Sequence, residues 1–119
     1  SVTTEAEVDD IRVEWQDRYG PLPDAAEALL GVARLRAECA RLDLREIAVT
    51  KGPSFGGPAF LARFAPLALK TSQQIRLKRL SPKAVYKEDV GQLQIPVNKA
   101  DDLVEHLVLL LRQLVPVEA

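Results

Sequence analysis

The sequence predicts an α+β domain in which an antiparallel sheet of about four strands, in two hairpins, is covered by about four helices. Three observations predict it. Apolar residues recur at helical spacing in the first third of the chain and again near its end. Between them, two pairs of short segments alternate apolar and other residues around turns. The resulting order is helix, helix, strand, strand, helix, strand, strand, helix. The two hairpins can form one four-stranded sheet, and the pattern leaves the strand order open.

The first predicted helix begins with a capping box, Thr4-Glu5-Ala6-Glu7, in which Thr4 is the N-cap and Glu7 reaches back to it. Its apolar stripe has helical spacing and consists of Val8, Ile11, Trp15 and Tyr19. The helix ends at Gly20 and Pro21, because glycine suits a left-handed cap and proline cannot continue a helix. We expect Trp15, Tyr19 and Leu22 to pack beneath the rigid corner Gly20-Pro21-Leu22-Pro23.

The second predicted helix runs from about Asp24 to Leu42 and has apolar residues on two adjacent faces. One face holds Ala26, Leu29, Leu30, Ala33, Ala37 and Ala40, and the other holds Ala28, Val32, Leu35, Cys39 and Leu42. An apolar stripe of this width indicates burial on two sides. The charged remainder of the helix surface consists of Arg34, Arg36, Glu38 and Arg41.

From residue 44 the period changes to that of a strand. Segments 44–50 and 59–65 alternate apolar residues with period two, and we expect them to pair as a hairpin. The segment between them, residues 52–58, is rich in Gly and Pro and is predicted to be the hairpin loop. A Gly-rich loop can also bind phosphate. This one lacks the Walker and dinucleotide patterns, and it joins two strands rather than opening a helix.

A short third helix is predicted with Thr71 or Ser72 as its cap and Ser81-Pro82 as its end. Segments 84–87 and 92–97 then read as the second hairpin, around a turn.

The last predicted helix starts within Asn98–Asp102 and ends at Pro116. Its main apolar face consists of Leu103, Leu107, Leu110 and Leu114, with Val104, Val108 and Leu111 beside it. A stripe of this kind is typical of a helix that covers a sheet.

The 119 residues are enough for one domain, which we place at residues 4–119 after a linker at residues 1–3. The chain contains no methionine, which favours a domain cut from a longer protein. It has 16 basic and 17 acidic residues, and this balance argues against a strong non-specific nucleic-acid binder. The single cysteine excludes an internal disulfide and fits a cytoplasmic protein. No apolar run is long enough to cross a membrane.

We expect no catalytic, cofactor-binding or metal-binding residue in this domain, and no enzyme activity, because no catalytic constellation is recognisable. Cys39 lies in the middle of a helix on an apolar face, which is typical of a core cysteine rather than of a nucleophile. His106 has Glu105 beside it but no evident nucleophile to activate.

One basic cluster consists of Arg76, Lys78, Arg79, Lys83 and Lys87. A solvated helix face explains such a cluster. The alternative function that it allows is that of a small nucleic-acid-binding module, with phosphate contacts made by these side chains.

Acidic residues gather on the first predicted helix. Two of them, Glu14 and Asp17, are three positions apart and therefore share one edge, and Asp10 lies one turn earlier near the same edge. Taken by itself, this pattern is typical of a solvated helix face. The functional alternative is an electrostatic docking edge for Arg or Lys residues of a protein partner.

The segment around these residues is similar to a known family. The motif Glu-x-x-Asp-Arg-Tyr-Gly-Pro-Leu-Pro at residues 14–23, followed by Ala-Leu-Leu, Val-Ala-Arg-Leu-Arg and Leu-x-Leu-x-x-Ile up to Ile47, resembles the C-terminal (TRCF) domain of the bacterial transcription-repair coupling factors (Mfd). The resemblance is specific over residues 8–47. It departs from the family at Trp15, where an aliphatic residue is expected, at Tyr19, where Phe is common, and at Asp43, where Gly is expected. Asp can adopt the left-handed conformation, so the turn stays feasible.

The resemblance implies a regulatory domain of a multi-domain, ATP-driven DNA translocase that removes stalled RNA polymerase from damaged DNA and recruits UvrA. Such a domain has no ATPase motif of its own. It docks on the UvrB-like module of the same protein and masks the UvrA-binding surface, and it meets RNA polymerase and DNA only through the parent protein. Glu14 and Asp17 match the acidic positions of the motif, so the resemblance implies that they pair with basic residues of the UvrB-like module.

Overall fold

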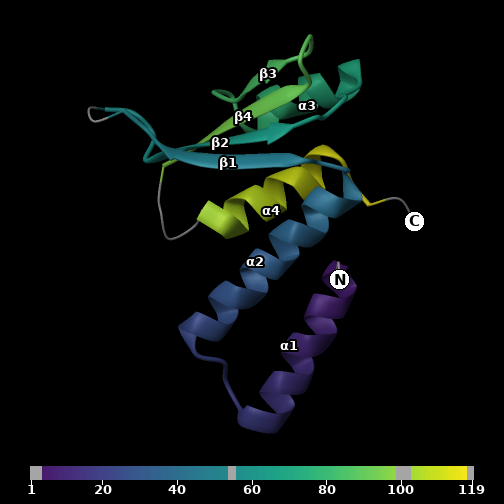
Figure 1. Ribbon diagram of the computed structural model, residues 1–119, viewed down its shortest axis with the longest axis vertical. Helices are drawn as coiled ribbons and strands as arrows, with labels where there is room; N and C mark the ends of the chain where they lie inside the picture. Colours follow the sequence, from purple (N-terminus) through teal and green to yellow (C-terminus); the bar gives the residue numbers. More distant parts are fainter. Residues whose placement is uncertain (1–3, 54–55, 99–102, 118–119) are drawn as a thin grey trace.

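The computed structural model describes residues 4–53, 56–98 and 103–117. Its elements, shown in Figure 1, are α1 (Glu5–Tyr19), α2 (Asp24–Arg41), β1 (Glu46–Lys51), β2 (Phe60–Ala65), α3 (Thr71–Leu80), β3 (Val85–Lys87), β4 (Gln92–Val97) and α4 (Leu103–Leu114). The predicted fold class and the predicted order of elements are both confirmed.

The cap of α3 differs from the prediction. The N-cap is Lys70, in an extended conformation, and Thr71 is already the first helical residue. The side chain of Gln73 accepts a hydrogen bond of 2.8 Å from the backbone N–H of Lys70. Because Gln73 already satisfies a backbone donor at this helix start, the first turn forms without a hydroxyl residue at the N-cap. The predicted start of the last helix falls largely on residues 99–102, which lie outside the described residues.

The two predicted hairpins join into one antiparallel sheet with the strand order β1-β2-β4-β3. The central pairing is between β2 and β4, where Phe64 lies opposite Leu93 and Ala62 lies opposite Ile95. These four side chains are fully buried. The sheet therefore places its largest apolar residues on its two middle strands, where the helices cover it.

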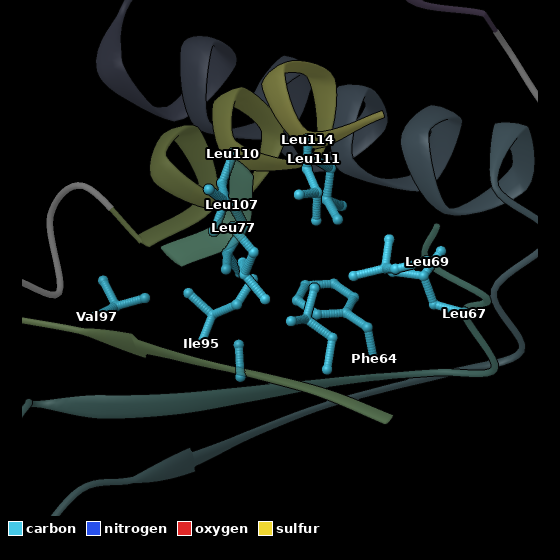
Figure 2. Packing of buried hydrophobic residues seen from close by; sticks show 12 residues of the cluster. Phe64, Leu67, Leu69, Leu77, Ile95, Val97, Leu107, Leu110, Leu111 and Leu114 are labelled. Atoms are coloured by element: carbon cyan, nitrogen blue, oxygen red, sulfur yellow. The ribbon is translucent and has the colours of Figure 1, made fainter. Parts of the chain in front are cut away.

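The core lies between one face of the sheet and helices α3 and α4. Figure 2 shows the leucines of α4 pointing towards Phe64 and Ile95 of the sheet, with Leu77 of α3 among them. The buried residues of this cluster are Ala62, Phe64, Leu67, Leu69, Leu77, Leu93, Ile95, Val97, Leu107, Leu110, Leu111 and Leu114. Helix α4 also packs against α2, so it is covered on both sides. This explains why it is the most apolar helix of the domain.

Helices α1 and α2 form a hairpin that extends away from the sheet, with α1 on its outer side (Figure 1). Val8 is the buried residue of α1, at 1% exposure. Two ion pairs join the helices, Arg12 with Glu27 at 2.9 Å and Arg34 with Asp9 at 3.1 Å. The predicted N-cap is confirmed, because the Thr4 hydroxyl accepts a hydrogen bond of 3.2 Å from the Glu7 backbone N–H. The Glu7 carboxylate reaches back to the Thr4 hydroxyl, at 3.2 Å, rather than to its backbone N–H.

The corner between α1 and α2 has the predicted glycine, but not all of the predicted packing. Gly20 has a φ of 79° and donates its backbone N–H to the Gln16 carbonyl at 2.8 Å. Trp15 and Leu22 are half-buried, as expected. Tyr19 is 72% exposed, so its predicted position beneath the corner is wrong. It lies in the last turn of α1, at the tip of the hairpin and far from the sheet.

Two residues at the end of α2 bear on the predictions. Asp43 has a φ of 55°, so the left-handed conformation expected of an aspartate in the place of glycine is confirmed. Glu38 was predicted on the charged surface of α2, and this is wrong, because it is 1% exposed. Its carboxylate is neutralised by Arg41 on the next turn, which makes its burial possible.

Among the described residues, no helix is long and apolar enough to cross a membrane.

Candidate functional site

The two predicted docking residues lie on the outer side of α1. Glu14 and Asp17 are both exposed, as is Asp10 one turn earlier. The Glu14 carboxylate lies 3.4 Å from the Arg18 guanidinium, and both side chains remain more than 60% exposed. An exposed pair of this kind contributes little stability, about 0.3–0.5 kcal/mol, and leaves Glu14 available to a second cation. Asp17 forms no ion pair with any described residue.

The other acidic residues of α1 are engaged within the domain. Asp9 pairs with Arg34 of α2, and Glu5 lies 3.4 Å from Arg112 of α4. Glu7 accepts a hydrogen bond of 3.2 Å from the Thr4 hydroxyl. Glu5 and Asp9 therefore face the other helices, whereas Glu7 is on the outer side of α1 and is bonded to the cap residue. Asp10, Glu14 and Asp17 point to solvent, and we call these three residues the acidic edge.

One exposed apolar side chain, Val13, accompanies the acidic edge, and the sequence analysis did not single it out. Val13 is 56% exposed and lies three residues after Asp10 and four before Asp17, so it is on the same side of α1. Tyr19 is 72% exposed at the tip of the hairpin, but it lies on the side of α1 that contains Val8, opposite the acidic edge. Val13 could have been found from its position, because it falls outside the stripe that contains Val8. Three carboxylates and one exposed apolar side chain therefore share this side of α1.

The residues considered for chemistry do not come together. Cys39 is half-buried against the core, and burial, with the nearby Glu38 carboxylate, raises the pKa of its thiol. A raised pKa makes the thiolate scarcer and the cysteine less reactive. His106 is exposed on α4. In the part of the chain that is described, no three His, Cys, Asp or Glu residues gather as a metal ion would require.

The basic cluster is divided between two roles. Arg76 is half-buried, and its guanidinium donates a hydrogen bond of 2.9 Å to the carbonyl oxygen of Leu114 at the end of α4. It therefore holds two helices together. The remaining members are exposed, and they are Lys78, Arg79, Lys83 and Lys87.

The Gly-rich segment is the connection of the first hairpin, as predicted. The backbone N–H of Gly52 donates to the Ala59 carbonyl at 2.8 Å, just beyond the paired ends of β1 and β2. Residues 54 and 55 lie outside the described ranges. The segment opens no helix, so a helix-terminus phosphate site is not built here.

A groove of about 760 Å³ lies between α2 and α4. Gly31 and Val104 approach closely within it, since a Cβ atom at Gly31 would meet a Val104 methyl group at 3.4 Å. Asp9 and Arg34 line the groove and neutralise each other. The rest of the lining is mixed, with apolar residues of α2 and α4 beside the charged Asp24, Glu27, Glu105 and Arg112.

The comparisons with known proteins bear on the first part of the chain. A family model described as "TRCF domain" matches residues 1–55. The chain carries a TRCF domain. The match takes in the acidic edge, the Gly20 corner, α2 and β1, and it confirms the resemblance seen in residues 8–47.

Curated relatives of this TRCF domain are all described as "Transcription-repair-coupling factor". Those of Mycobacterium bovis and Mycobacterium tuberculosis are each 34% identical over 103 residues, which is 87% of this chain and 8% of theirs. That of Escherichia coli is 47% identical over 47 residues, 40% of this chain and 4% of its own. A match of 103 residues extends beyond the part that the family model covers and into the sheet. The chain spans less than a tenth of the length of these relatives.

Proposed function

We propose that this TRCF domain is the regulatory domain of a transcription-coupled DNA repair translocase, which it holds in the repressed state. It docks on the UvrB-like module of the parent protein and masks the surface that binds UvrA. The observation that carries the proposal is the acidic edge. Asp17 is exposed and pairs with no described residue, and Glu14 is mostly exposed, within the part that matches the family.

The chemistry of the edge suits a reversible contact. Carboxylates on a helix surface attract Arg and Lys residues of a partner, and such charges contribute orientation and association rate more than affinity. Val13 adds apolar contact area beside them. Interfaces between domains of one chain are typically modest and polar, on the order of 600–1,500 Å², which allows them to open.

The ATPase, the DNA contacts and the contact with RNA polymerase belong to the parent translocase in this proposal, as does a cytoplasmic location. The domain contributes a docking surface and needs no cofactor. By docking or detaching, the domain controls whether the UvrA-binding surface is accessible.

The test is a charge reversal of the edge in the full-length protein, Glu14→Arg with Asp17→Arg. We expect UvrA to bind the variant more tightly than the wild type, because like charges would push the domain away from the UvrB-like module. The isolated 119-residue domain should keep its thermal unfolding midpoint, since both side chains are exposed. A matched control is Glu88→Arg with Asp89→Arg, the same change of charge at exposed positions between β3 and β4. UvrA affinity that is the same in the edge variant and the wild type would contradict the proposal.

A second candidate function is a small nucleic-acid-binding module. The observation in its favour is that Lys78, Arg79, Lys83 and Lys87 are exposed together around α3 and β3. A titration of the domain with duplex DNA at two salt concentrations separates the two functions. Tight binding that weakens steeply with salt would favour the nucleic-acid module.

A further inference from the structure

Helix α1 is attached to the rest of the domain by few contacts. It packs against α2 through Val8 and two ion pairs, and most of its remaining surface is polar and exposed. Its first residue is an exception, because the side chain of Glu5 is only 14% exposed. That side chain points to a group of charges contributed by three helices, formed by Glu5 of α1, Glu38 and Arg41 of α2, and Arg112 of α4. We call these four residues the charge joint.

The inner part of the joint is a closed pair. The guanidinium of Arg41 donates two hydrogen bonds to the Glu38 carboxylate, at 2.6 and 3.0 Å. A third contact, at 3.5 Å, reaches the Leu111 carbonyl of α4. Burial would raise the pKa of Glu38, but Arg41 and the hydrogen bond from Glu5 outweigh it, and the pKa lies below its ordinary value. Glu38 is therefore ionised, and the hydrogen-bonding capacity of Arg41 is largely used.

The outer part of the joint is not closed. Oε1 of Glu5 is buried and accepts no hydrogen bond from a described residue. Arg112 lies 3.4 Å from it, but its side chain is 52% exposed, so solvent screens its charge. A buried carboxylate without hydrogen bonds is costly, whereas a neutral carboxyl can donate one to the Glu38 carboxylate beside it. The geometry thus favours a proton on Glu5.

The pKa of Glu5 agrees with this geometry. Burial raises it most, the hydrogen bond with Glu38 and the charge of Glu38 raise it further, and Arg112 and Arg41 lower it, with a result of about 7. The thiol of Cys39, next to Glu38, is the other titratable group affected by this carboxylate, and its pKa is raised. The groups that face Glu5 are thus Glu38 and Arg41 from α2 and Arg112 from α4.

We propose that the charge joint fixes the orientation of α1, and with it the acidic edge, through one proton shared between Glu5 and Glu38. Loss of this proton leaves two carboxylates side by side and loosens the start of α1. A loosened helix presents Asp10, Glu14 and Asp17 in many orientations, so docking becomes weaker. Glu5 and Glu38 are positioning residues in this scheme, and the scheme rests on the proposed docking function for its biological consequence.

The chain contains its own reporter for the test. Trp15 is the only tryptophan, lies on α1 and is half-buried, so its fluorescence reports the packing of this helix. In the 119-residue domain we expect the emission to shift to longer wavelengths as the pH rises, with a midpoint near 7. In Glu5→Gln, which mimics the protonated carboxyl, the shift should disappear. In Arg112→Gln, which removes a charge that lowers the pKa of Glu5, the midpoint should move to higher pH.

Two control variants make the assignment specific. Glu7→Gln changes an exposed carboxylate of the same helix turn, and His106→Gln removes the only histidine of the sequence. Both should keep the wild-type transition. Two results would contradict the proposed role of the shared proton. One is a wild-type emission that does not change with pH, and the other is a transition that persists in Glu5→Gln. These readings do not depend on docking.

The link to function is a second measurement. In the full-length protein, UvrA binding should increase with pH over the same range, and this dependence should be lost in Glu5→Gln. A Trp15 transition without any pH dependence of UvrA binding would overturn the functional link and leave the joint in place. If Glu14→Arg with Asp17→Arg left the UvrA affinity unchanged, that result would instead contradict the docking function itself.

Discussion

The guanidinium of Arg76 on α3 donates a hydrogen bond of 2.9 Å to the carbonyl oxygen of Leu114, which ends α4. This carbonyl is among the last four of the helix, which have no partner within it. A cation at this end also interacts favourably with the helix dipole. The contact takes one residue out of the basic cluster and gives it a structural role that spacing along the sequence does not reveal.

We predict that Arg76→Ala lowers the free energy of unfolding by about 1–2 kcal/mol, because it leaves the Leu114 carbonyl without its charged donor. Urea unfolding followed by circular dichroism measures the effect. The control is Arg79→Ala, which removes an exposed cation from the same helix and should change stability by less than about 0.5 kcal/mol. Equal losses in the two variants would show that the Leu114 contact contributes nothing of its own.

Tyr86 supports a second prediction, on the segment that leads into α3. Its hydroxyl donates to the Leu67 carbonyl at 2.6 Å and accepts from the Leu69 backbone N–H at 3.0 Å. Tyr86→Phe leaves both backbone groups without this partner, and we expect a loss of about 1–3 kcal/mol in urea unfolding. Tyr19→Phe removes a hydroxyl from an exposed tyrosine and should leave the unfolding midpoint unchanged.

Asp43 supports a prediction of the opposite direction. Its φ of 55° is costly for a residue with a Cβ atom and is readily adopted by glycine. We therefore expect Asp43→Gly to raise the thermal midpoint, with a gain in stability of up to about 1 kcal/mol. Asp43→Val should lower it, because a β-branched side chain tolerates this conformation poorly. A glycine variant less stable than the wild type would mean that the Asp43 side chain makes a contact that outweighs the strain.

The sequence predicted those features that depend on near neighbours along the chain. The Thr4 cap, the Gly20 end of α1 and the left-handed turn at Asp43 are all local, and each follows from the chemistry of a few adjacent residues. The periods of helices and strands are local in the same sense, so the order of elements was also predictable. The exposure of Glu14 and Asp17 followed from their spacing on one helix edge.

The features that the sequence left open or placed wrongly depend on contacts between distant segments. The strand order depends on the pairing of β2 with β4, which joins two hairpins across α3. The helical period places Glu38 on the surface of α2. In the folded domain it is buried, and Arg41 neutralises its charge. Tyr19 has the period of the buried stripe, but the hairpin tip extends beyond anything that could cover it. Periodicity predicts which side of a helix is apolar. It does not predict how far along the helix other elements cover that side.

The stability of the domain should depend on pH through the two carboxyls of the charge joint. Burial and the neighbouring Glu38 raise the pKa of Glu5 from 4.5 to about 7, so between these values the folded protein holds a proton that the unfolded chain has released. The free energy of unfolding must then fall as the pH rises from 4.5 to about 7. Glu38 acts in the opposite direction at lower pH, because its pKa is lowered by Arg41 despite burial, and its contribution is lost as the pH falls below 4.5. We therefore expect maximum stability in mildly acidic solution, measured by urea unfolding over a pH series. In Glu5→Gln the free energy of unfolding should no longer fall above pH 4.5, while its loss below pH 4.5 should remain. If the free energy of unfolding of this variant still falls above pH 4.5, another group causes the fall.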